Sequence, residues 1–331
     1  MLYGYAAALL GLAFLAAGCA KEELQPAAEP AESPPTTVAP VGKVRAIGMG
    51  AEGMIFHERS GSVAVGLREP YRLAFVDPDG LFIRRQFILS NPIRHLGLSP
   101  EGVNVVVPIE SANKVREIRP DRPMGPEIPT GEHPHDATSA RGKLFVADEF
   151  GDTVSVIEDG EVVQTLPAPA QPGGIAASGD SFIAMITVSE RVLQVYDAAS
   201  GEALGQVPAG TGPTHIETFG RYAYVADTEG DMIRMFFIGR KPEEVVAVSA
   251  AGVPYGIAVD PTRKLLWVTL TATNQLAGYS IRGPLPRRVA TYATVRQPNT
   301  VTVDPRNGDV FVASRSNATI QRISPEQELA K

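Results

Sequence analysis

The sequence predicts an all-β protein, a seven-bladed β-propeller of four-stranded blades, on three observations. One thirteen-residue pattern occurs seven times, further strands precede and follow each copy, and the two ends of the chain complement each other. The copies start about 40 residues apart, which is the length of one propeller blade. A sheet of this size cannot bury both faces alone, whereas seven sheets arranged in a ring cover one another.

Each copy of the pattern predicts a strand, a tight turn and a second strand. Apolar or β-branched residues come first, a centre rich in Gly, Asn, Asp and Ser follows, and alternation then resumes. We expect a glycine or asparagine in the centre to supply the positive φ that such turns need. The copies are "AVGLREPYRLAFV" (64–76), "VVPIESANKVREI" (106–118), "FVADEFGDTVSVI" (145–157), "AMITVSERVLQVY" (184–196), "YVADTEGDMIRMF" (224–236), "WVTLTATNQLAGY" (267–279) and "FVASRSNATIQRI" (311–323).

A third strand precedes each hairpin and lines the central channel of the predicted ring. It begins at a proline in six repeats, and Glu52 takes that place in the first. The six are Pro92, Pro134, Pro172, Pro213, Pro254 and Pro298.

A fourth strand follows the hairpins, but the last repeat ends without one. The clearest fourth strands are "EVVQTLPA" (161–168), "EALGQVPA" (202–209) and "RRVATYAT" (287–294). An unassigned strand, "GKVRAIGM" (42–49), precedes the first repeat. We predict that it completes the last blade, which closes the ring and covers an edge that would otherwise invite aggregation.

The N-terminal region has the pattern of an export signal. An apolar run (6–18) ends in small residues before Cys19, the only cysteine, so no intramolecular disulfide is possible. The segment "LAAGC" (15–19) resembles a bacterial lipobox, which implies a signal peptide over 1–18 and acylation of Cys19. An uncleaved anchor helix is the alternative interpretation.

The predicted organisation has four parts. The signal peptide is followed by a Pro/Ala/Glu-rich disordered tether (19–41), the propeller (42–324) and a short tail (325–331). We expect a monomer in the cell envelope, anchored by lipid on the outer side of the cytoplasmic membrane or on the outer membrane. The formal net charge of −7, without a basic run, argues against a nucleic-acid partner.

The repeats resemble known propeller families. "FVADEFGDTVSVI" is similar to the YVTN-type repeat of bacterial propellers, and "PYGIAVDP" (254–261) is similar to strands of NHL-type propellers, lactonases and the streptogramin B lyase. The resemblance covers about residues 50–324. It implies the fold, but these families share blades and differ in chemistry.

Histidines gather at the starts of the channel-lining strands. Counted from the closing proline of each repeat, His95, Asp136 and His215 fall at equivalent positions, and His135 lies one residue earlier. Imidazoles with a carboxylate can bind a metal ion or transfer protons. They can equally bond to neighbouring backbone carbonyls, and the sequence leaves both interpretations open.

Two functions follow as hypotheses. The first is a binding or scaffold module that takes a protein, glycan or small molecule at the mouth of its channel. The predicted ligand-binding residues are Arg94, His95, His135, Asp136, His215, Tyr255 and Asn299. The second is a metal-assisted lactonase or lyase, with His215 and Glu217 as candidate catalytic residues. A divalent metal ion is then the expected cofactor, with His95, His135, Asp136 and His215 as its candidate ligands.

Overall fold

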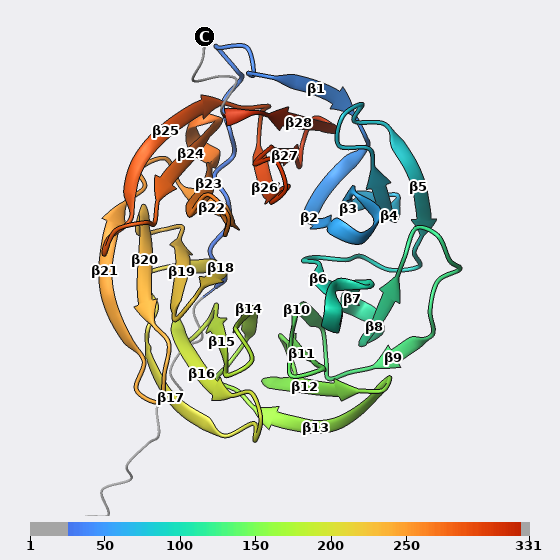
Figure 1. The fold of residues 1–331 in the computed structure, drawn as a ribbon, viewed down its shortest axis with the longest axis vertical. Helices are drawn as coiled ribbons and strands as arrows, with labels where there is room; N and C mark the ends of the chain where they lie inside the picture. Colours follow the sequence, from blue (N-terminus) through green and yellow to red (C-terminus); the bar gives the residue numbers. More distant parts are fainter. Residues whose placement is uncertain (1–25, 326–331) are drawn as a thin grey trace, which may run out of the picture.

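The structure, a computed structural model, describes residues 26–325 and has seven four-stranded antiparallel sheets around a central channel (Figure 1). In six sheets the strands run outward from the channel in chain order, and in the seventh the N-terminal strand β1 is outermost. Each blade packs on the next. The seven-bladed all-β prediction is therefore confirmed. Cys19 and the predicted signal peptide lie outside the described residues. No helix in 26–325 is long and apolar enough to cross a membrane.

The first four blades comprise the following strands, given from the channel outward. Blade 1 contains β2 (Met49–His57), β3 (Ser62–Glu69), β4 (Tyr71–Val76) and β5 (Ile83–Ile88). Blade 2 contains β6 (Gly97–Leu98), β7 (Val105–Ile109), β8 (Lys114–Ile118) and β9 (Glu127–Pro129). Blade 3 contains β10 (Pro134–Ala140), β11 (Lys143–Asp148), β12 (Thr153–Glu158) and β13 (Glu161–Pro167). Blade 4 contains β14 (Pro172–Ser178), β15 (Phe182–Thr187), β16 (Val192–Asp197) and β17 (Ala203–Pro208).

The remaining blades follow the same plan, with four short 3₁₀ turns in the connections. Blade 5 contains β18 (Pro213–Phe219), β19 (Tyr222–Asp227), β20 (Met232–Phe237) and β21 (Glu243–Ser249). Blade 6 contains β22 (Pro254–Asp260), β23 (Leu265–Leu270), β24 (Gln275–Ser280) and β25 (Arg287–Ala293). Blade 7 contains β26 (Pro298–Val303), β27 (Val310–Ser314), β28 (Thr319–Ile323) and β1 (Lys43–Ala46). The turns are η1 (Glu58–Ser60), η2 (Pro100–Gly102), η3 (Glu110–Ala112) and η4 (Thr271–Thr273).

The hairpin turns use positive φ, but not at glycine. In six of the seven copies the residue at the same place in the turn has a φ between 51° and 58°, and none of the six is glycine. Asn and Asp supply four of them because their short polar side chains tolerate this conformation. The six residues are Asn113, Asp152, Arg191, Asp231, Asn274 and Ala318.

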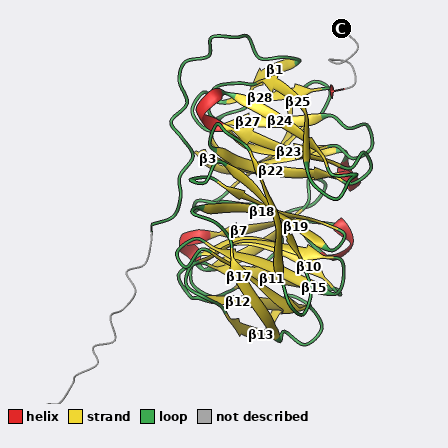
Figure 2. Ribbon diagram, turned by 90° about the vertical axis from the view of Figure 1, so that its left-hand side faces the viewer, coloured by secondary structure: helices red, strands yellow, loops and turns green. Residues whose placement is uncertain are grey.

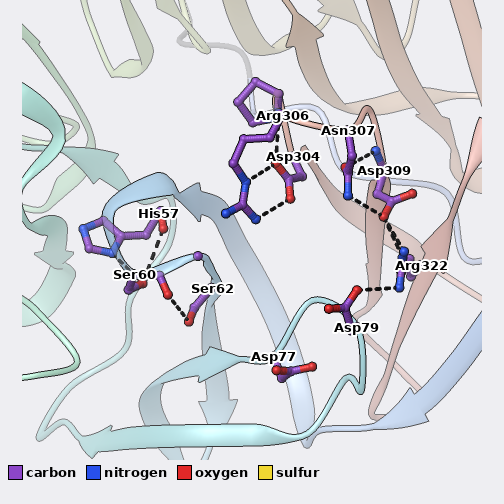
Figure 3. Close-up of polar contacts among 12 residues, drawn as sticks. His57, Ser60, Ser62, Asp77, Asp79, Asp304, Arg306, Asn307, Asp309 and Arg322 are labelled. Atoms are coloured by element: carbon purple, nitrogen blue, oxygen red, sulfur yellow. Dashed lines mark hydrogen bonds and ion pairs between the residues drawn. The ribbon is translucent and has the colours of Figure 1, made fainter.

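The predicted ring closure is confirmed with a shorter strand. β1 pairs antiparallel with β28, with Val44 opposite Gln321, and the predicted segment 42–49 ends in the first residue of β2. Figure 3 shows a second link between the ends of the ring: Arg322 of blade 7 bonds to Asp309 in its own blade (2.7 Å) and to Asp79 of blade 1 (3.0 Å). The first and last blades are thus held together by a strand and by charged side chains.

Two predicted strand starts are corrected. In blade 2 the inner strand begins at Gly97 rather than Pro92, and Ile93 forms only an isolated bridge with Ile109. The extra residue in this repeat interrupts the pairing that the other blades have. In blade 1, Ala51 pairs with Leu67 in the same way as Pro134 pairs with Asp148 in blade 3. Ala51, not Glu52, therefore takes the place of the opening proline.

Residues 26–41 differ from the disordered tether predicted for 19–41. They run along one face of the ring, past β22 and β18 (Figures 1 and 2), and Ala28 and Ser33 are buried. The segment is poor in large apolar side chains, so composition indicated disorder. Hydrogen bonds from rim side chains to its backbone hold it instead. We call residues 28–34 the strap.

Candidate functional site

Strand pairing places two rings of residues at the strap end of the channel. The residue two positions after each opening proline, or its equivalent, forms what we call the lumen ring. The residue one position earlier forms the rim ring, where the pairing of most blades is irregular. The lumen ring is Gly53, His95, Asp136, Gly174, His215, Gly256 and Thr300. The rim ring is Glu52, Arg94, His135, Gly173, Thr214, Tyr255 and Asn299.

The predicted equivalence of His95, Asp136 and His215 therefore agrees with the strand register. The large side chains of both rings meet because glycine occupies the lumen ring in blades 1, 4 and 6. At Gly53 a Cβ atom would lie 2.2 Å from the carbonyl oxygen of Arg94, so the neighbouring blade approaches too closely for any side chain there.

Four aromatic rings form a continuous bar across the channel. His215 stacks on His95, with centroids 4.5 Å apart and an interplanar angle of 29°. Tyr255 meets His215 edge-on at 4.5 Å, and His135 meets His95 edge-on at 4.8 Å. The four rings come from blades 6, 5, 2 and 3. We call this group the imidazole bar, and it narrows the strap end of the channel.

Carboxylates orient the imidazoles on one side of the bar. Nδ1 of His135 lies 3.0 Å from Oε2 of Glu149, and both side chains are buried. Nδ1 of His95 lies 3.5 Å from Oδ2 of Asp136. Burial acts to raise the pKa of Glu149, but the hydrogen bond from His135 outweighs it and lowers this pKa. The carboxylate therefore stays ionised.

Two other rim residues, Arg94 and Glu52, form ion pairs with residues of the hairpin loops. Arg94 lies 2.5 Å from Glu110. Burial acts to lower the pKa of Arg94, but the charge of Glu110 outweighs it and raises this pKa. Glu52 accepts a hydrogen bond from Asn299 at 3.1 Å and lies 3.0 Å from Arg315. These contacts hold the rim side chains in place around the imidazole bar.

His215 has no such partner. Its Nδ1 is buried and makes no hydrogen bond within residues 26–325. Burial, reinforced by the charges of His95, His135 and Arg94, holds the pKa of His215 well below its usual value. The imidazole is therefore neutral at physiological pH and available as a base or as a hydrogen-bonding group.

A cavity of about 380 Å³ lies against the bar and extends along the channel. His95, Asp136 and His215 line it, and so does Glu217, two residues further along β18. Burial, together with the charge of Asp136, raises the pKa of Glu217 to about 8. A neutral carboxyl group and a neutral imidazole thus face one cavity from the same strand.

The cavity continues toward the face opposite the strap. A second cavity of about 170 Å³ shares Ile55, Glu217 and Thr302 with the first and reaches the exposed Glu58. The channel is therefore a pocket with the imidazole bar at its base and its opening at the other face. The histidines of the bar lie at the end of the channel where the inner strands begin.

The predicted site residues fall into two groups, and the two remaining histidines lie outside both. His95, Asp136, His215 and Glu217 line the cavity, whereas Arg94, His135, Tyr255 and Asn299 surround it without lining it. His133 packs against Phe150 on the rim at 4.5 Å. His57 lies at the far end of β2, where it bonds to Ser60 at 2.8 Å (Figure 3).

Sequence reasoning missed the partners supplied by the hairpin loops. Glu149, Glu110 and Arg315 were not among the predicted site residues. Each lies just after a second strand of its blade, and that place brings the loop back over the rim. Their position in the repeat was the signal that could have identified them.

The arrangement bears on the metal hypothesis. The ring faces of His95 and His215 meet, so their nitrogen lone pairs do not converge on one point. Within residues 26–325, no group of three or more His, Cys, Asp or Glu side chains is placed to hold a metal ion.

Comparisons with known proteins identify the fold. No protein-family model and no curated protein sequence matches the chain. A streptogramin B lyase structure is 16% identical with a TM-score of 0.71, covering 85% of this chain and 96% of that one. Virginiamycin B lyase from Staphylococcus aureus is 17% identical, with a TM-score of 0.69, covering 85% and 98%. A chain of a mitotic checkpoint complex is 14% identical, with a TM-score of 0.74, covering 95% and 98%. Enzymes and an assembly component share these blades, so the likeness carries the fold alone.

Proposed function

We propose that this protein is a binding propeller of the cell envelope, of YVTN type and anchored by lipid at Cys19, that takes a small polar ligand into its channel. The ligand enters at the face opposite the strap and reaches the imidazole bar. The observation that carries the proposal is the cavity of about 380 Å³ in which His95, Asp136, His215 and Glu217 meet. Its volume suits a small molecule rather than a protein segment or a long glycan.

The charges of the cavity favour a ligand with a positively charged group. Among the described residues, no lysine or arginine lines either cavity. Asp136 and Glu217 both face the first cavity, and Glu217 makes no ion pair in the described part of the chain. An ammonium group beside them would stabilise both carboxylates, whereas an anionic group would be repelled.

Calorimetry with three matched probes tests the proposal: butylammonium, butanol and butyrate. We expect wild-type protein to bind butylammonium most tightly, and Glu217→Gln to weaken that binding by about tenfold. His215→Phe, which keeps the ring stack, should weaken all binding, whereas His133→Ala on the rim should change nothing. A pocket that prefers butyrate, or wild-type protein that binds no probe at millimolar concentration, would contradict the proposal.

A second candidate function is a lyase or lactonase that works by acid–base chemistry. It is favoured by the pairing of a neutral imidazole, His215, with a protonated carboxyl group, Glu217, on one strand. In elimination, His215 would accept a proton from the substrate, a double bond would form, and Glu217 would protonate the leaving group. In hydrolysis, His215 would accept a proton from the attacking water, and Glu217 would protonate the alcohol oxygen that leaves. Hydrolysis or elimination of a chromogenic lactone should then decline above pH 8, as Glu217 loses its proton. Activity that is equal in His215→Phe and wild type would exclude this role.

A further inference from the structure

The strap lies in a site that hydrogen-bonds to its backbone. The Ala31 N–H donates to Oγ1 of Thr271 at 3.0 Å, and the Ser33 N–H donates to Oε1 of Gln297 at 2.8 Å. Gln297 returns a bond from Nε2 to the Ala31 carbonyl at 2.8 Å, so one amide side chain bonds the strap twice. Asn274 donates to the carbonyl of Pro34 at 2.9 Å.

Bonds within the propeller organise part of this site. Thr271, Asn274 and Gln297 are all buried on the rim of blades 6 and 7. Thr271 donates from Oγ1 to the carbonyl of Val253 at 3.0 Å, and Oδ1 of Asn274 accepts from the Gln297 N–H at 3.0 Å. These bonds fix the side chains of Thr271 and Asn274, whereas the Gln297 side chain bonds to the strap itself.

The strap fits the site with its own side chains as well. Ser33 is buried, and its hydroxyl donates to the carbonyl of Thr271 at 2.5 Å. Ala28 packs at Gly212 of blade 5, where a Cβ atom would lie 2.8 Å from the Ala28 methyl group. Glu29 lies 3.9 Å from Arg315, the partner of Glu52 at the channel wall.

We propose that the rim of blades 5–7 is a peptide-docking site whose occupant is the chain's own strap, and that docking fixes how the propeller faces its anchor. The site recognises an extended segment mainly through backbone groups, with a small side chain at Ala28 and a hydroxyl at Ser33. Docking makes the N-terminal segment leave the ring at the face that carries the imidazole bar.

Chain length gives this docking a consequence for orientation, which rests on the proposed anchor at Cys19. An extended chain spans at most about 3.4 Å per residue. From Cys19 to the docked Ala28 the reach is about 30 Å, whereas a free tether from Cys19 to residue 41 would reach about 75 Å. A docked strap thus keeps the bar face toward the membrane and the open end of the pocket away from it.

Hydrogen exchange of the detergent-purified full chain tests the docking without reference to any ligand. We expect the Ala31 amide to exchange at least tenfold more slowly than in a synthetic peptide of residues 26–40. Ser33→Pro removes the N–H donor and the hydroxyl of Ser33, and Gln297→Ala removes the acceptor of that N–H and the donor to the Ala31 carbonyl. Both should raise the Ala31 rate to that of the free peptide, and Thr37→Ala should not.

Two results would overturn the docking: wild-type Ala31 exchange at the free-peptide rate, or unchanged Ala31 exchange in Ser33→Pro with β11 amides still protected.

Orientation has a separate readout. A fluorophore at Glu58→Cys, on the open face, should transfer energy to a lipid dye more efficiently in Ser33→Pro than in otherwise wild-type protein. Equal transfer would overturn the orientation. Failure of either readout leaves ligand binding in the channel untouched, so the two proposals are tested separately.

Discussion

The surroundings of Glu217 strongly disfavour the ionised form of its carboxyl group. It lies in the channel wall near Asp136, and no cationic side chain pairs with it in the described part of the chain. Its pKa is raised from 4.5 to about 8 by burial and by that neighbouring carboxylate. The folded protein therefore keeps a proton that the unfolded chain releases between these values.

This difference predicts a dependence of stability on pH. Since the folded pKa of Glu217 is the higher one, its favourable contribution is complete below pH 4.5 and is lost as pH rises through about 8. The melting temperature of wild type should fall between pH 5 and pH 8 by more than that of Glu217→Gln, which cannot ionise. Glu161→Gln, on an exposed outer strand, is the matched control. Parallel curves for wild type and Glu217→Gln would contradict the prediction.

The candidate site shows which residues a sequence can bring together. His95, Asp136 and His215 were predictable as neighbours because repeat register alone places equivalent positions around one ring. The contact of Glu149 with His135 was not predictable, because it depends on the path of a hairpin loop over the rim. The stacking of His95 on His215 was equally hidden, since it depends on side-chain direction across the channel and on glycine in neighbouring blades.

At the level of elements, β1 is a strand that acts through its backbone. All four of its side chains are exposed, so it buries no apolar surface of its own. It pairs with β28 along its whole length, and Arg45 donates to the carbonyl of Gly80 in blade 1 at 2.9 Å. Its role is to cover the outer edge of blade 7 and to join it to blade 1.

Deletion of residues 42–46 should therefore destabilise the whole ring rather than one blade. We expect the melting temperature to fall by about 5–10 °C, with aggregation through the exposed edge of β28. Val44→Thr, which keeps the strand and changes only an exposed side chain, should melt close to wild type. Scanning calorimetry with light scattering measures both effects. Identical melting of the deletion variant and wild type would show that β1 does not close the ring.

The strap and β1 lie on the same N-terminal segment, yet the sequence indicated only one of them. β1 was predictable because the last repeat lacked an outer strand and the pattern of 42–49 supplied one. Strap docking was not, because a Pro-rich segment with few apolar residues has no periodicity that reveals a partner. Its hydrogen bonds come from rim side chains such as Gln297, which is 264 residues from Ser33 along the chain.

At the level of the whole molecule, the two ends of the channel differ. The bar end carries the strap and four packed rings, and the other end opens past Glu58. The repeat places the starts of all inner strands at one end, and the residues that break the repeat at those starts give that end its packed rings. If the N-terminus is anchored, this asymmetry presents the pocket to whatever surrounds the cell envelope.

The final prediction concerns that anchor. Acylation of Cys19 by the lipoprotein pathway should place the protein in the membrane fraction, because a diacylated cysteine with a further acyl chain partitions strongly into a bilayer. Cys19→Ser should carry no lipid and should either be released from the membrane fraction or keep its N-terminal segment uncleaved. Metabolic labelling with a radioactive fatty acid, followed by fractionation, measures both properties.

Ala20→Ser, next to the acylation position, is the control and should still be labelled. Labelled lipid on Cys19→Ser would show that acylation occurs at another residue, and wild-type protein in the membrane fraction without label would show that the uncleaved apolar segment is the anchor. In either case the strap would still dock, but the 30 Å limit on its distance from the membrane would no longer hold.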